Sequence, residues 1–530
     1  MNLKTKGRPV TEPIGVVGAG TMGAGIAQVA AVAGRRVLLA DAVPGAAERA
    51  IAKIRDRVKA QVEKGRLGAD PAELDLTAVE IAGLTECGVV AEAIVEDLGA
   101  KQALFAELEG VVGADCMLAS NSSSLTATAM AAGLAHPGRL VGLHFFNPVP
   151  AMRLVEVISG LATAPEVADA AAELAAGWGK TVVRSAATPG FIVNRIARPY
   201  YAEAWRLYEE HATTAAAIDA VLTGAGGFRM GPFALMDLIG HDVNEAVTRS
   251  VWAAFGHDPR FAPSLAQRAL VEAGWLGRKT GRGIYSYTDP ATAAADPAPA
   301  AARPLTVIEY GHDLTDNSKT QLRELIGRSL GVAVIARDRD DAAAGLPDGL
   351  LELPSGALLI QCTGATATAL SAAFERPVIV VDRMLNPAKA TAIAVAPSDG
   401  CPPAALAETI GLFQAGHLNV FVIDDVPGLI VTRTVAMLAN LAADALASRV
   451  ASEADIDTAM RLGVNYPLGP LAWAREWGTS DILGILDSME NWYRDGHYRA
   501  SPLLRRAALS QRAPSGGTLL PRQSQQGEHY

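Results

Sequence analysis

A histidine and a glutamate twelve residues apart are the strongest candidates for an acid–base pair in this 530-residue chain. His144 ends the apolar segment 140–144, and Glu156 lies within the apolar run 154–158. Histidine titrates near neutral pH, and a carboxylate behind it fixes the tautomer and raises the basicity of the ring. A carboxylate among apolar neighbours also needs a partner, because burying it alone is costly. The pattern predicts that His144 is a general base oriented by Glu156; the alternative is a satisfied core histidine and an unrelated surface glutamate.

A glycine-rich turn near the start of the chain could hold a dinucleotide. In order, the sequence predicts a strand at 14–17, a GxGxxG turn at 18–23, a helix at 24–33 and a strand at 35–40. Gly18 allows a tight turn, Gly20 lets the backbone approach a pyrophosphate, and Gly23 lets helix and strand pack closely. Asp41 ends the second strand, where its carboxylate can accept hydrogen bonds from ribose hydroxyls and would repel a 2′-phosphate. The pattern favours NAD over NADP; the alternative is a glycine-rich turn beside an ordinary surface aspartate.

Two further strands are predicted to end in polar side chains. One runs from Val89 to Glu96, and the next leads from Met117 to the serines around Ser123. The carboxyl ends of parallel strands form the ligand-binding edge of an open α/β sheet. We therefore expect Glu96, Ser123 and His144 to lie at the same edge as the glycine turn.

Six segments, in this order, resemble the 3-hydroxyacyl-CoA dehydrogenase family. They are GAGTMGAGIA (18–27), EAIVEDLGAK (92–101), SNSSSL (120–125), HFFNPVPAMRLVEVI (144–158), TPGFIVNR (188–195) and GRKTGRGIY (277–285). A seventh segment, ASEADIDTAMRLGVNYPLGPLAW (451–473), extends the resemblance to the long bacterial members that act on 3-hydroxyadipyl-CoA in phenylacetate catabolism. The resemblance implies an α/β Rossmann-type dinucleotide-binding domain followed by an all-α domain, with NAD as the cofactor and an acyl-CoA as the substrate.

The resemblance also implies a role for each matching residue. His144 would take the proton of the substrate 3-hydroxyl as hydride leaves C3 for the nicotinamide, and Glu156 would orient it. Ser123 and Asn194 would hydrogen-bond the hydroxyl or the developing keto oxygen, and Lys64 would contact the CoA phosphates. The implied NAD contacts are Gly18, Gly20, Thr21, Met22, Gly23, Asp41, Glu96, Lys101, Asn147 and Lys279. Plainer alternatives are solvated helix charges for the lysines at 64 and 101, a turn residue at 147 and a helix cap at 123.

The second half of the chain repeats part of the first half. Residues 189–195 (PGFIVNR) recur as 427–433 (PGLIVTR), and other matching pairs keep the same offset, which predicts the duplication of a helical module. Aligning the segment 379–387 with 140–148 places Arg383 where His144 stands, and Thr432 replaces Asn194. This second copy also lacks a GxGxxG turn, so we expect one active site per chain. The alternative is that residues 305–425 are an unrelated α/β insert.

The repeat gives a domain plan: a degenerate second α/β plus all-α copy follows the first. We expect the second helical module, from Pro427 to Leu504, to pack on the module 188–285 and imitate a partner subunit. The segment 289–304, rich in alanine and proline, is predicted to be a linker that packs poorly. The predicted boundaries are 1–187 (NAD-binding domain), 188–288 (helical domain), 289–304 (linker), 305–425 (degenerate Rossmann-like domain), 426–510 (second helical domain) and 511–530 (flexible tail).

Composition excludes several classes of partner. The net charge of −10 argues against nucleic acid and anionic membranes, and no apolar run reaches the roughly 18 residues of a membrane span. Four cysteines without CxxC spacing predict a reducing compartment and no zinc ribbon. Hydride transfer needs no metal, and the nine histidines lack the spacing of metal ligands. We therefore predict a cytoplasmic protein, a homo-oligomer, with no metal, no nucleic acid and no membrane partner.

The substrate stays open between two acyl chains. 3-Hydroxyadipyl-CoA is expected first and 3-hydroxybutyryl-CoA second, and a cation near the distal carboxylate would distinguish them. Arg153, Arg195 and Arg198 are the candidates for that cation. From other classes, a non-catalytic NAD-binding structural protein is disfavoured by the presence of both His144 and Glu156. A dehydrogenase of free β-hydroxyacids is disfavoured because that chemistry relies on a catalytic lysine in the helical domain.

Overall fold

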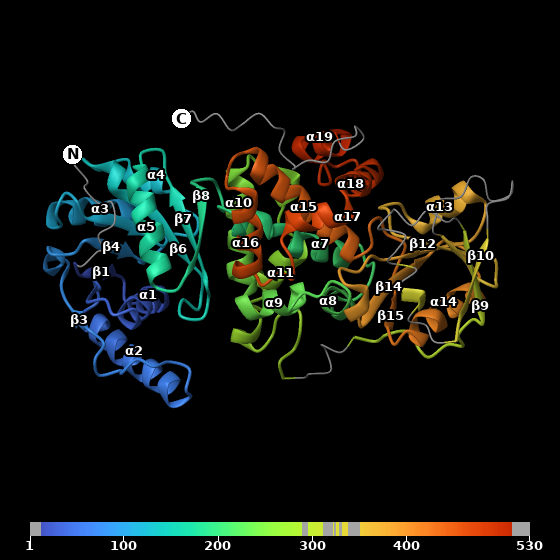
Figure 1. The fold of residues 1–530 in the computed structure, drawn as a ribbon, viewed down its shortest axis with the longest axis horizontal. Coiled ribbons are helices and arrows are strands. Elements are labelled where there is room, and N and C mark those ends of the chain that lie inside the picture. The colour runs from blue at the N-terminus through green and yellow to red at the C-terminus, as the bar shows by residue number, and fades with distance from the viewer. Residues whose placement is uncertain are drawn as a thin grey trace. The chain divides into compact units, whose positions relative to one another are not determined.

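The computed structural model describes residues 12–288, 295–310, 322, 325–327, 331–337 and 350–510 (Figure 1). The chain divides into two compact units. The first contains the residues up to Arg195 together with Ser448–Val464, and the second contains Ile196–Ala447 and the residues from Asn465 onward. The predicted tail at 511–530 and the first part of the predicted linker, 289–294, lie outside the described residues.

An eight-stranded sheet forms the centre of the first unit, with the order β3-β2-β1-β4-β5-β6-β7-β8. Its neighbouring strands are parallel except for the antiparallel pair β6 and β7. The strands read as nearly continuous apolar runs because helices cover both faces of a parallel sheet. Their bounds are β1 Ile14–Val17, β2 Val37–Ala40, β3 Leu76–Ala78, β4 Val89–Glu92, β5 Met117–Ser120, β6 Leu140–Phe145, β7 Leu154–Ser159 and β8 Thr181–Ala186.

Two apolar cores lie on the two faces of this sheet. One is made with α1 (Thr21–Val32), α2 (Ala46–Glu63) and α5 (Pro165–Gly177), and the other with α3 (Leu98–Val111) and α4 (Ala127–Ala131). The element order predicted for residues 14–41 is confirmed, although the helix begins earlier, at Thr21. The strand predicted to end at Glu96 ends instead at Glu92, and Glu96 lies in the loop before α3.

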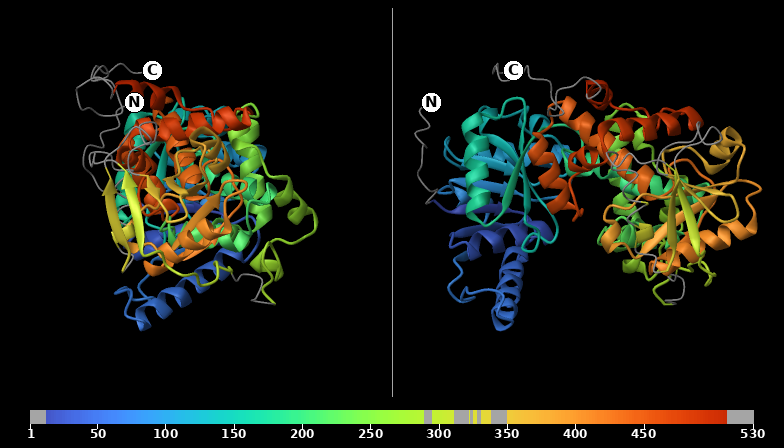
Figure 2. Two further views of the ribbon diagram at one scale, coloured as in Figure 1. Left: turned by 90° about the vertical axis from the view of Figure 1, so that its right-hand side faces the viewer. Right: turned by 45° about the vertical axis from the view of Figure 1, so that its right-hand side comes forward.

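The second unit holds a first helical module, a second sheet and most of a second helical module (Figures 1 and 2). The first module comprises α7 Arg198–Glu209, α8 Ala215–Gly224, α9 Pro232–Ile239, α10 His241–Ala254 and α11 Leu265–Glu272. The second sheet has the order β10-β9-β11-β12-β13-β14-β15. Its strands are β9 Thr306–Tyr310, β10 Ala333–Arg337, β11 Leu351–Glu352, β12 Leu358–Gln361, β13 Val378–Val381, β14 Ala392–Pro397 and β15 Asn419–Val422, with helices α13 Ala367–Phe374 and α14 Pro403–Ala415.

The second helical module contains α15 Val431–Ala447, α16 Glu453–Gly463, α17 Pro470–Trp477, α18 Thr479–Tyr493 and α19 Pro502–Ser510. The starts of β7, α5, α8, α9 and α10 recur, all at one constant offset along the chain, as the starts of β14, α14, α16, α17 and α18. The strand pairings β5–β6, β6–β7 and β7–β8 recur, with the same directions, in β12–β13, β13–β14 and β14–β15. From β12 onward the second copy is therefore a degenerate repeat of the first, and residues 358–425 are not an unrelated insert.

Strand register corrects the residue that replaces His144 in the second copy. In the first sheet His144 lies opposite Glu156, and the equivalent pair in the second sheet is Asp382 and Ala394, whose backbones bond at 3.0 Å. Arg383, which the sequence comparison placed at this position, instead corresponds to Phe145. Aligning the two segments on their shared Asn-Pro dipeptide shifts the register by one residue. Neither residue of the acid–base pair is therefore present in the second copy.

Asp382 holds the start of a helix rather than a histidine. Its buried carboxylate accepts hydrogen bonds from the backbone amides of Ile430, Val431 and Thr432, at 2.7 to 3.0 Å. In the first copy, the amides of Ile192 and Val193, the counterparts of Ile430 and Val431, donate to Glu156. Burial raises the pKa of Asp382, and the hydrogen bonds it accepts only partly oppose this. Both copies therefore place a carboxylate at the amino end of this helix. It comes from β7 in the first copy and from the end of β13 in the second.

The second copy is also closed where a ligand would lie. A side chain added at Gly364, just past β12, would meet the carbonyl oxygen of Ile485 on α18 at 2.6 Å. Arg383 donates to the carbonyl of Cys362 at 3.1 Å and to Asp481 on α18 at 3.2 Å. Helix α18 therefore fills the carboxyl edge of this sheet, which explains why the second copy needs no glycine turn.

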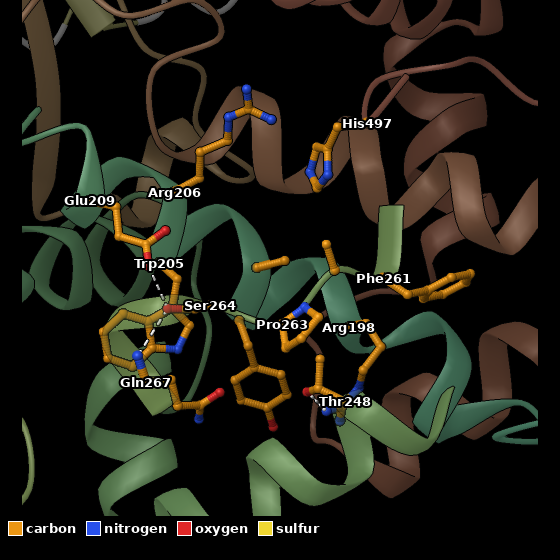
Figure 3. A pocket seen from close by; sticks show the side chains of 13 residues that line it. Arg198, Trp205, Arg206, Glu209, Thr248, Phe261, Pro263, Ser264, Gln267 and His497 are labelled. Atoms are coloured by element: carbon orange, nitrogen blue, oxygen red, sulfur yellow. Dashed lines mark hydrogen bonds between the residues drawn. The ribbon is translucent and has the colours of Figure 1, made fainter. Parts of the chain in front are cut away.

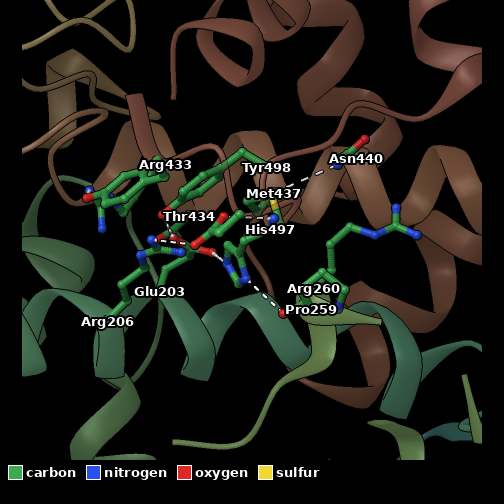
Figure 4. Close-up of polar contacts among 12 residues, drawn as sticks. Glu203, Arg206, Pro259, Arg260, Arg433, Thr434, Met437, Asn440, His497 and Tyr498 are labelled. Atoms are coloured by element: carbon green, nitrogen blue, oxygen red, sulfur yellow. Dashed lines mark hydrogen bonds and ion pairs between the residues drawn. The ribbon is translucent and has the colours of Figure 1, made fainter. Parts of the chain in front are cut away.

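The two helical modules pack together within the second unit, as the repeat predicted. Phe228 contacts Tyr466, its own counterpart in the repeat, with ring centroids 5.1 Å apart. Self-pairing of equivalent residues is the mark of a two-fold interface. Polar contacts cross the same interface from Glu203 to His497 (2.7 Å) and Tyr498 (2.9 Å) (Figure 4). One chain therefore contains an internal pseudo-dimer of helical modules.

Each helical module also contributes one helix to the other copy's sheet. Helix α16 packs on β7 and β8 of the first sheet, and α8 packs on β14 of the second. The amide of Ala186 donates to the carbonyl of Val450 at 2.7 Å, and the amide of Asp424 donates to that of Ala212 at 2.9 Å. These two bonds are the same contact with the copies exchanged. The exchange couples the duplicated halves more closely than side-by-side packing would.

The described part of the predicted linker, 295–304, is hydrogen-bonded to the second sheet and α14, although most of its side chains are exposed. The amide of Ala298 donates to the carbonyl of Val420 on β15 at 2.7 Å. The side chain of Gln414 on α14 donates to the carbonyl of Ala298 at 3.0 Å and accepts from the amide of Ala301 at 3.0 Å. An extended backbone can use its own amides and carbonyls in this way even when its side chains are small. In the described ranges, no helix is long and apolar enough to cross a membrane.

Candidate active site

The glycine turn leaves its backbone open where helix α1 begins. Gly18 has φ +104°, and a side chain there would lie 2.5 Å from the carbonyl oxygen of Ala93. A side chain at Gly23 would lie only 1.8 Å from the carbonyl oxygen of Gly18, whereas one at Gly20 would meet no described atom within 4 Å. Among the described residues, no side chain caps the amino end of α1. The first turn of the helix, which includes Thr21 and Met22, is thus accessible to an anion such as a diphosphate.

Asp41 joins this turn to the end of β2. One carboxylate oxygen accepts from the amide of Ala19 at 2.6 Å, and the other accepts from the amide of Val43 at 2.8 Å. The carboxylate of Asp41 thus lies beside the glycine turn, where a ribose attached to the diphosphate would be bound. The arrangement fits NAD, as the sequence predicted.

Substituting Gly23 by alanine should weaken NAD binding strongly. The added methyl group collides with the Gly18 carbonyl, so β1 and α1 must separate and the turn must shift. We expect the affinity for NAD, measured by titration calorimetry, to fall on the order of 100-fold, equivalent to about 2.7 kcal/mol. Gly110→Ala is the matched control, because that exposed glycine of α3 has no described neighbour to meet within 4 Å. Equal affinities in the two variants would contradict the turn's proposed role.

A buried ion pair lies beneath the loop that follows β4. Glu92 accepts from the ammonium of Lys101 at 2.5 Å, from the hydroxyl of Ser120 at 2.6 Å and from the amide of Ile94 at 2.7 Å. Lys101 is only 1% exposed, so it is not a solvated helix charge. Its ammonium also lies 3.4 Å from Glu96. The pair ties the ends of β4 and β5 to helix α3.

Glu96 accepts several hydrogen bonds from the serine loop that follows β5, residues 122–124. Its carboxylate accepts from the amides of Ser123 and Ser124 at 3.0 and 2.9 Å and from the hydroxyl of Ser122 at 2.7 Å. Burial by itself would raise the pKa of Glu96, but the hydrogen bonds of the serines and the charge of Lys101 outweigh it and lower that pKa. The hydroxyl of Ser123 is 3.4 Å from the same oxygen. Thr126, not Ser123, caps α4.

His144 and Glu156 form a buried pair across the antiparallel strands β6 and β7. The ring nitrogen Nδ1 lies 2.7 Å from the Glu156 carboxylate, and the two residues are 6% and 0% exposed. The rings of Phe146 and Phe191 flank the imidazole at centroid distances of 4.6 and 5.7 Å. With the Nδ1 proton on the carboxylate side, Nε2 is left as the proton acceptor. The predicted pair is therefore assembled, and the alternative of an unrelated surface glutamate is wrong.

Glu156 also positions the segment that carries Asn194. Its second oxygen accepts from the amides of Ile192 and Val193 at 3.2 and 3.1 Å. These amides open the short helix α6 (Val193–Ile196), and Asn194 follows directly. One carboxylate therefore fixes both the imidazole and the start of the helix. Asn121 supports the same edge, because its side-chain oxygen accepts from the amide of Phe145 at 2.9 Å.

The loop after β6 contains Asn147, whose peptide bond to Pro148 is cis. Lys180 holds this loop from within, since its ammonium donates to the carbonyls of Val149 and Met152 at 2.5 and 2.8 Å. Burial lowers the pKa of Lys180. Loop and helix α1 are in close contact, because a side chain at Gly25 would lie 2.8 Å from Val149. Asn147 is therefore part of a fixed loop next to the glycine turn.

Two predicted site residues are not brought together with these groups within the first unit. Lys64 is exposed at the carboxyl end of α2, and its side chain makes no hydrogen bond or ion pair with the described residues. Lys279 belongs to the second unit, where its ammonium bonds both oxygens of Asp242 at 2.6 and 2.7 Å. The segment around Lys279 is anchored by Asp237, which accepts from His241 at 2.7 Å and from the amides of Ile284 and Tyr285.

Sequence reasoning missed the supporting residues Glu92, Ser120 and Lys180. Glu92 carried a usable signal, because an acid that ends an apolar strand must find a partner inside the fold. Lys180 carried none, since its partners are main-chain carbonyls some thirty positions away. Among the described residues, no cluster of three or more side chains is suited to hold a metal ion.

Family models match most of the chain, apart from residues 288–358 and the two ends. The family model "3-hydroxyacyl-CoA dehydrogenase, NAD binding domain" matches residues 13–188. The model "3-hydroxyacyl-CoA dehydrogenase, C-terminal domain" matches twice, at 190–287 and 428–516, and the starts of these matches keep the offset of the repeat. Between them, residues 359–427 match the "3-hydroxybutyryl-CoA dehydrogenase reduced Rossmann-fold domain".

Individual relatives agree with these matches. The 3-hydroxyadipyl-CoA dehydrogenase of Escherichia coli is 43% identical over 502 residues, which cover 94% of this chain and 98% of the relative. A probable 3-hydroxybutyryl-CoA dehydrogenase of Bacillus subtilis is 39% identical, and the match covers 52% of this chain and 96% of the relative. A crystal structure of a 3-hydroxybutyryl-CoA dehydrogenase from Escherichia coli has a TM-score of 0.82 at 42% identity, covering 94% of this chain and 98% of that one.

Proposed function

We propose that this chain, which belongs to the 3-hydroxyacyl-CoA dehydrogenase family, oxidises 3-hydroxyadipyl-CoA better than other acyl thioesters. The reaction is the NAD-dependent oxidation of an (S)-3-hydroxyacyl-CoA to the 3-oxoacyl-CoA. A 43% identical relative that matches over nearly its whole length is a 3-hydroxyadipyl-CoA dehydrogenase. That reaction belongs to phenylacetate catabolism, which we propose as the setting of this enzyme.

NAD, when bound, supplies the acceptor for the hydride that leaves C3. The residues at the glycine turn fit it, because the backbone at Gly20 is unobstructed and the carboxylate of Asp41 stands beside the turn. We propose Gly18, Gly20, Thr21, Met22, Gly23 and Asp41 as the dinucleotide contacts, with Glu96, Lys101, Asn147 and Lys279 as further ones. Lys101 would act through Glu96, since its own ammonium is buried.

His144 is the proposed general base. Because Glu156 accepts a hydrogen bond from Nδ1–H at 2.7 Å, Nε2 is free to take the proton of the substrate 3-hydroxyl. The carboxylate then stabilises the imidazolium that forms, in a site that the rings of Phe146 and Phe191 shield from water. We propose that Ser123 and Asn194 hydrogen-bond the substrate oxygen and that Lys64 contacts the CoA phosphates. The buried histidine–glutamate pair is the observation that carries this proposal.

A comparison of two thioesters tests the substrate assignment. We expect NADH formation from both (S)-3-hydroxyadipyl-CoA and (S)-3-hydroxybutyryl-CoA, with kcat/KM higher for the adipyl thioester by roughly tenfold or more. A preference for the butyryl thioester would instead support the runner-up, which agrees with the name of the Escherichia coli protein of known structure. Absence of NADH with every thioester would favour a non-catalytic NAD-binding protein, which the His144–Glu156 pair argues against.

Location and assembly are further proposals. We propose a cytoplasmic enzyme, since NAD and acyl-CoA are intracellular metabolites and all four cysteines are unpaired thiols. We also propose a homo-oligomer, as the sequence led us to expect. Because the faces of the two helical modules already pair within one chain, such an oligomer would have to use a different surface from that pairing.

A further inference from the structure

A small pocket beside the first helical module contains a buried arginine that no carboxylate in the described part of the chain neutralises. The pocket has a volume of about 210 Å³ and is lined by side chains of α7, α10 and α11, by residues 261–264 and by His497 of the second helical module (Figure 3). Arg198, at the start of α7, is 5% exposed. Its guanidinium donates to the hydroxyl of Thr248 at 3.0 Å and lies 4.9 Å from the ring of Tyr201, while its Nε atom has no hydrogen-bond partner among the described residues.

No carboxylate of the described residues lies within ion-pair distance of Arg198. Burial lowers the pKa of this guanidinium, and only the tyrosine hydroxyls at 201 and 466 oppose that shift. Glu209, the one acid that lines the pocket, accepts instead from the hydroxyl of Ser264 at 2.7 Å and from the amide of Ala266 at 2.9 Å. Figure 3 shows it beside Ser264, away from Arg198 and Thr248. A buried arginine keeps its charge, and its contacts with Thr248 and Tyr201 bring no opposite charge to it, so the pocket favours an anionic ligand.

The second copy shows that the fold does not need this arginine. At the equivalent position of α15 stands Ala436, which is fully buried, and Leu486 replaces Thr248. Tyr201 and Trp205, which form pocket walls, become Ala439 and Ala443. The same helix therefore packs well without a cation or a pocket. The arginine, its hydroxyl partner and the aromatic walls occur together only in the copy that carries the glycine turn.

We propose that this pocket is a binding site for an aliphatic carboxylate, with Arg198 as its anchor. A single uncompensated guanidinium matches one carboxylate, which its planar fork can bind through two hydrogen bonds, whereas a phosphate dianion would leave excess charge. The walls of Trp205, Phe261 and Pro263 suit a short hydrocarbon chain behind that carboxylate. Two sources share this chemistry: the distal carboxylate of a dicarboxylic acyl-CoA and a free dicarboxylate. The first source rests on the proposed function.

The test compares wild type with Arg198→Ala, which makes α7 resemble α15 at this position, and with the exposed control Arg268→Ala. If the substrate supplies the carboxylate, Arg198→Ala lowers the ratio of kcat/KM for 3-hydroxyadipyl-CoA over 3-hydroxybutyryl-CoA by roughly 100-fold. If the carboxylate is free, adipate alone raises the thermal midpoint of the wild type and not of the variant, while the ratio stays the same. The control should match the wild type in both assays.

A variant that changes neither the substrate ratio nor the response to adipate would overturn the proposal. Folding of Arg198→Ala is checked by circular dichroism, and Arg198→Lys provides a second variant that keeps the charge but loses the fork. We expect Arg198→Lys to keep part of the preference for the adipyl thioester or of the stabilisation by adipate. A lysine variant equal to wild type in both assays would also count against the site. Failure of the wild type to oxidise either thioester would refute the proposed function, whereas the adipate measurement would still decide the carboxylate site.

Discussion

Replacing His144 by glutamine is expected to lower kcat about 1,000-fold while leaving NAD affinity nearly unchanged. Glutamine can still hydrogen-bond Glu156, so the strands β6 and β7 should keep their register. It cannot take a proton, so the substrate hydroxyl loses its base. The glycine turn and Asp41 make no contact that depends on this side chain. Initial rates with saturating thioester, together with calorimetric titration of NAD, measure the two effects separately.

His136→Gln is the control for this prediction. His136 is a histidine of the same unit, in the segment that precedes β6, and its backbone amide bonds Glu109 whatever the side chain is. We expect wild-type kcat for that variant. If His144→Gln kept most of its kcat, the proton acceptor would have to be another group and the assignment of the base would be wrong.

Glu156→Gln should have a comparable effect on kcat for a different reason. The amide group can turn its NH₂ toward His144, which would place the ring proton on Nε2 and remove the acceptor. The charge that stabilises the imidazolium is lost as well. In a serine protease, the equivalent loss of a carboxylate behind a histidine lowers kcat about 10,000-fold, and we expect a fall of at least roughly 100-fold here. NAD affinity again serves as the comparison, because the dinucleotide turn is unaffected.

Asp382→Asn supplies the matched control, since the second copy separates the two roles of Glu156. Asp382 accepts hydrogen bonds from a helix start, as Glu156 does, but it faces no histidine. We expect Asp382→Asn to reduce the free energy of unfolding by about 1–3 kcal/mol without changing kcat of the folded protein. A loss of kcat similar to that of Glu156→Gln would show that the second copy takes part in the reaction.

Local patterns were enough to find the chemistry of the first copy. The GxGxxG turn, its flanking strands and Asp41 are adjacent in sequence, so their spacing predicts their geometry. His144 and Glu156 are separated by one short connection between neighbouring strands, and antiparallel pairing brings them opposite one another. By contrast, the pair Glu92–Lys101 joins a strand to the next helix, and its short contact depends on how α3 packs on the sheet.

The second copy shows where pattern comparison fails. Matching an Asn-Pro dipeptide placed Arg383 at the position of His144, and a shift of one residue in a strand exchanges the two faces. The pairing of β13 with β14 places Asp382 at that position, at the same offset that residues 189–195 and 427–433 keep. The exchange of α8 and α16 between the copies is invisible in sequence, because equivalent helices have equivalent patterns wherever they pack.

We expect one chain to carry one dinucleotide site, built from the first copy alone. Equilibrium titration of the full chain with NADH measures the number of sites directly. We expect one NADH per chain for the wild type and strongly weakened binding for Gly23→Ala, since the second sheet lacks a glycine turn and α18 fills its carboxyl edge. Two NADH per chain, or full binding by the Gly23 variant, would contradict this account.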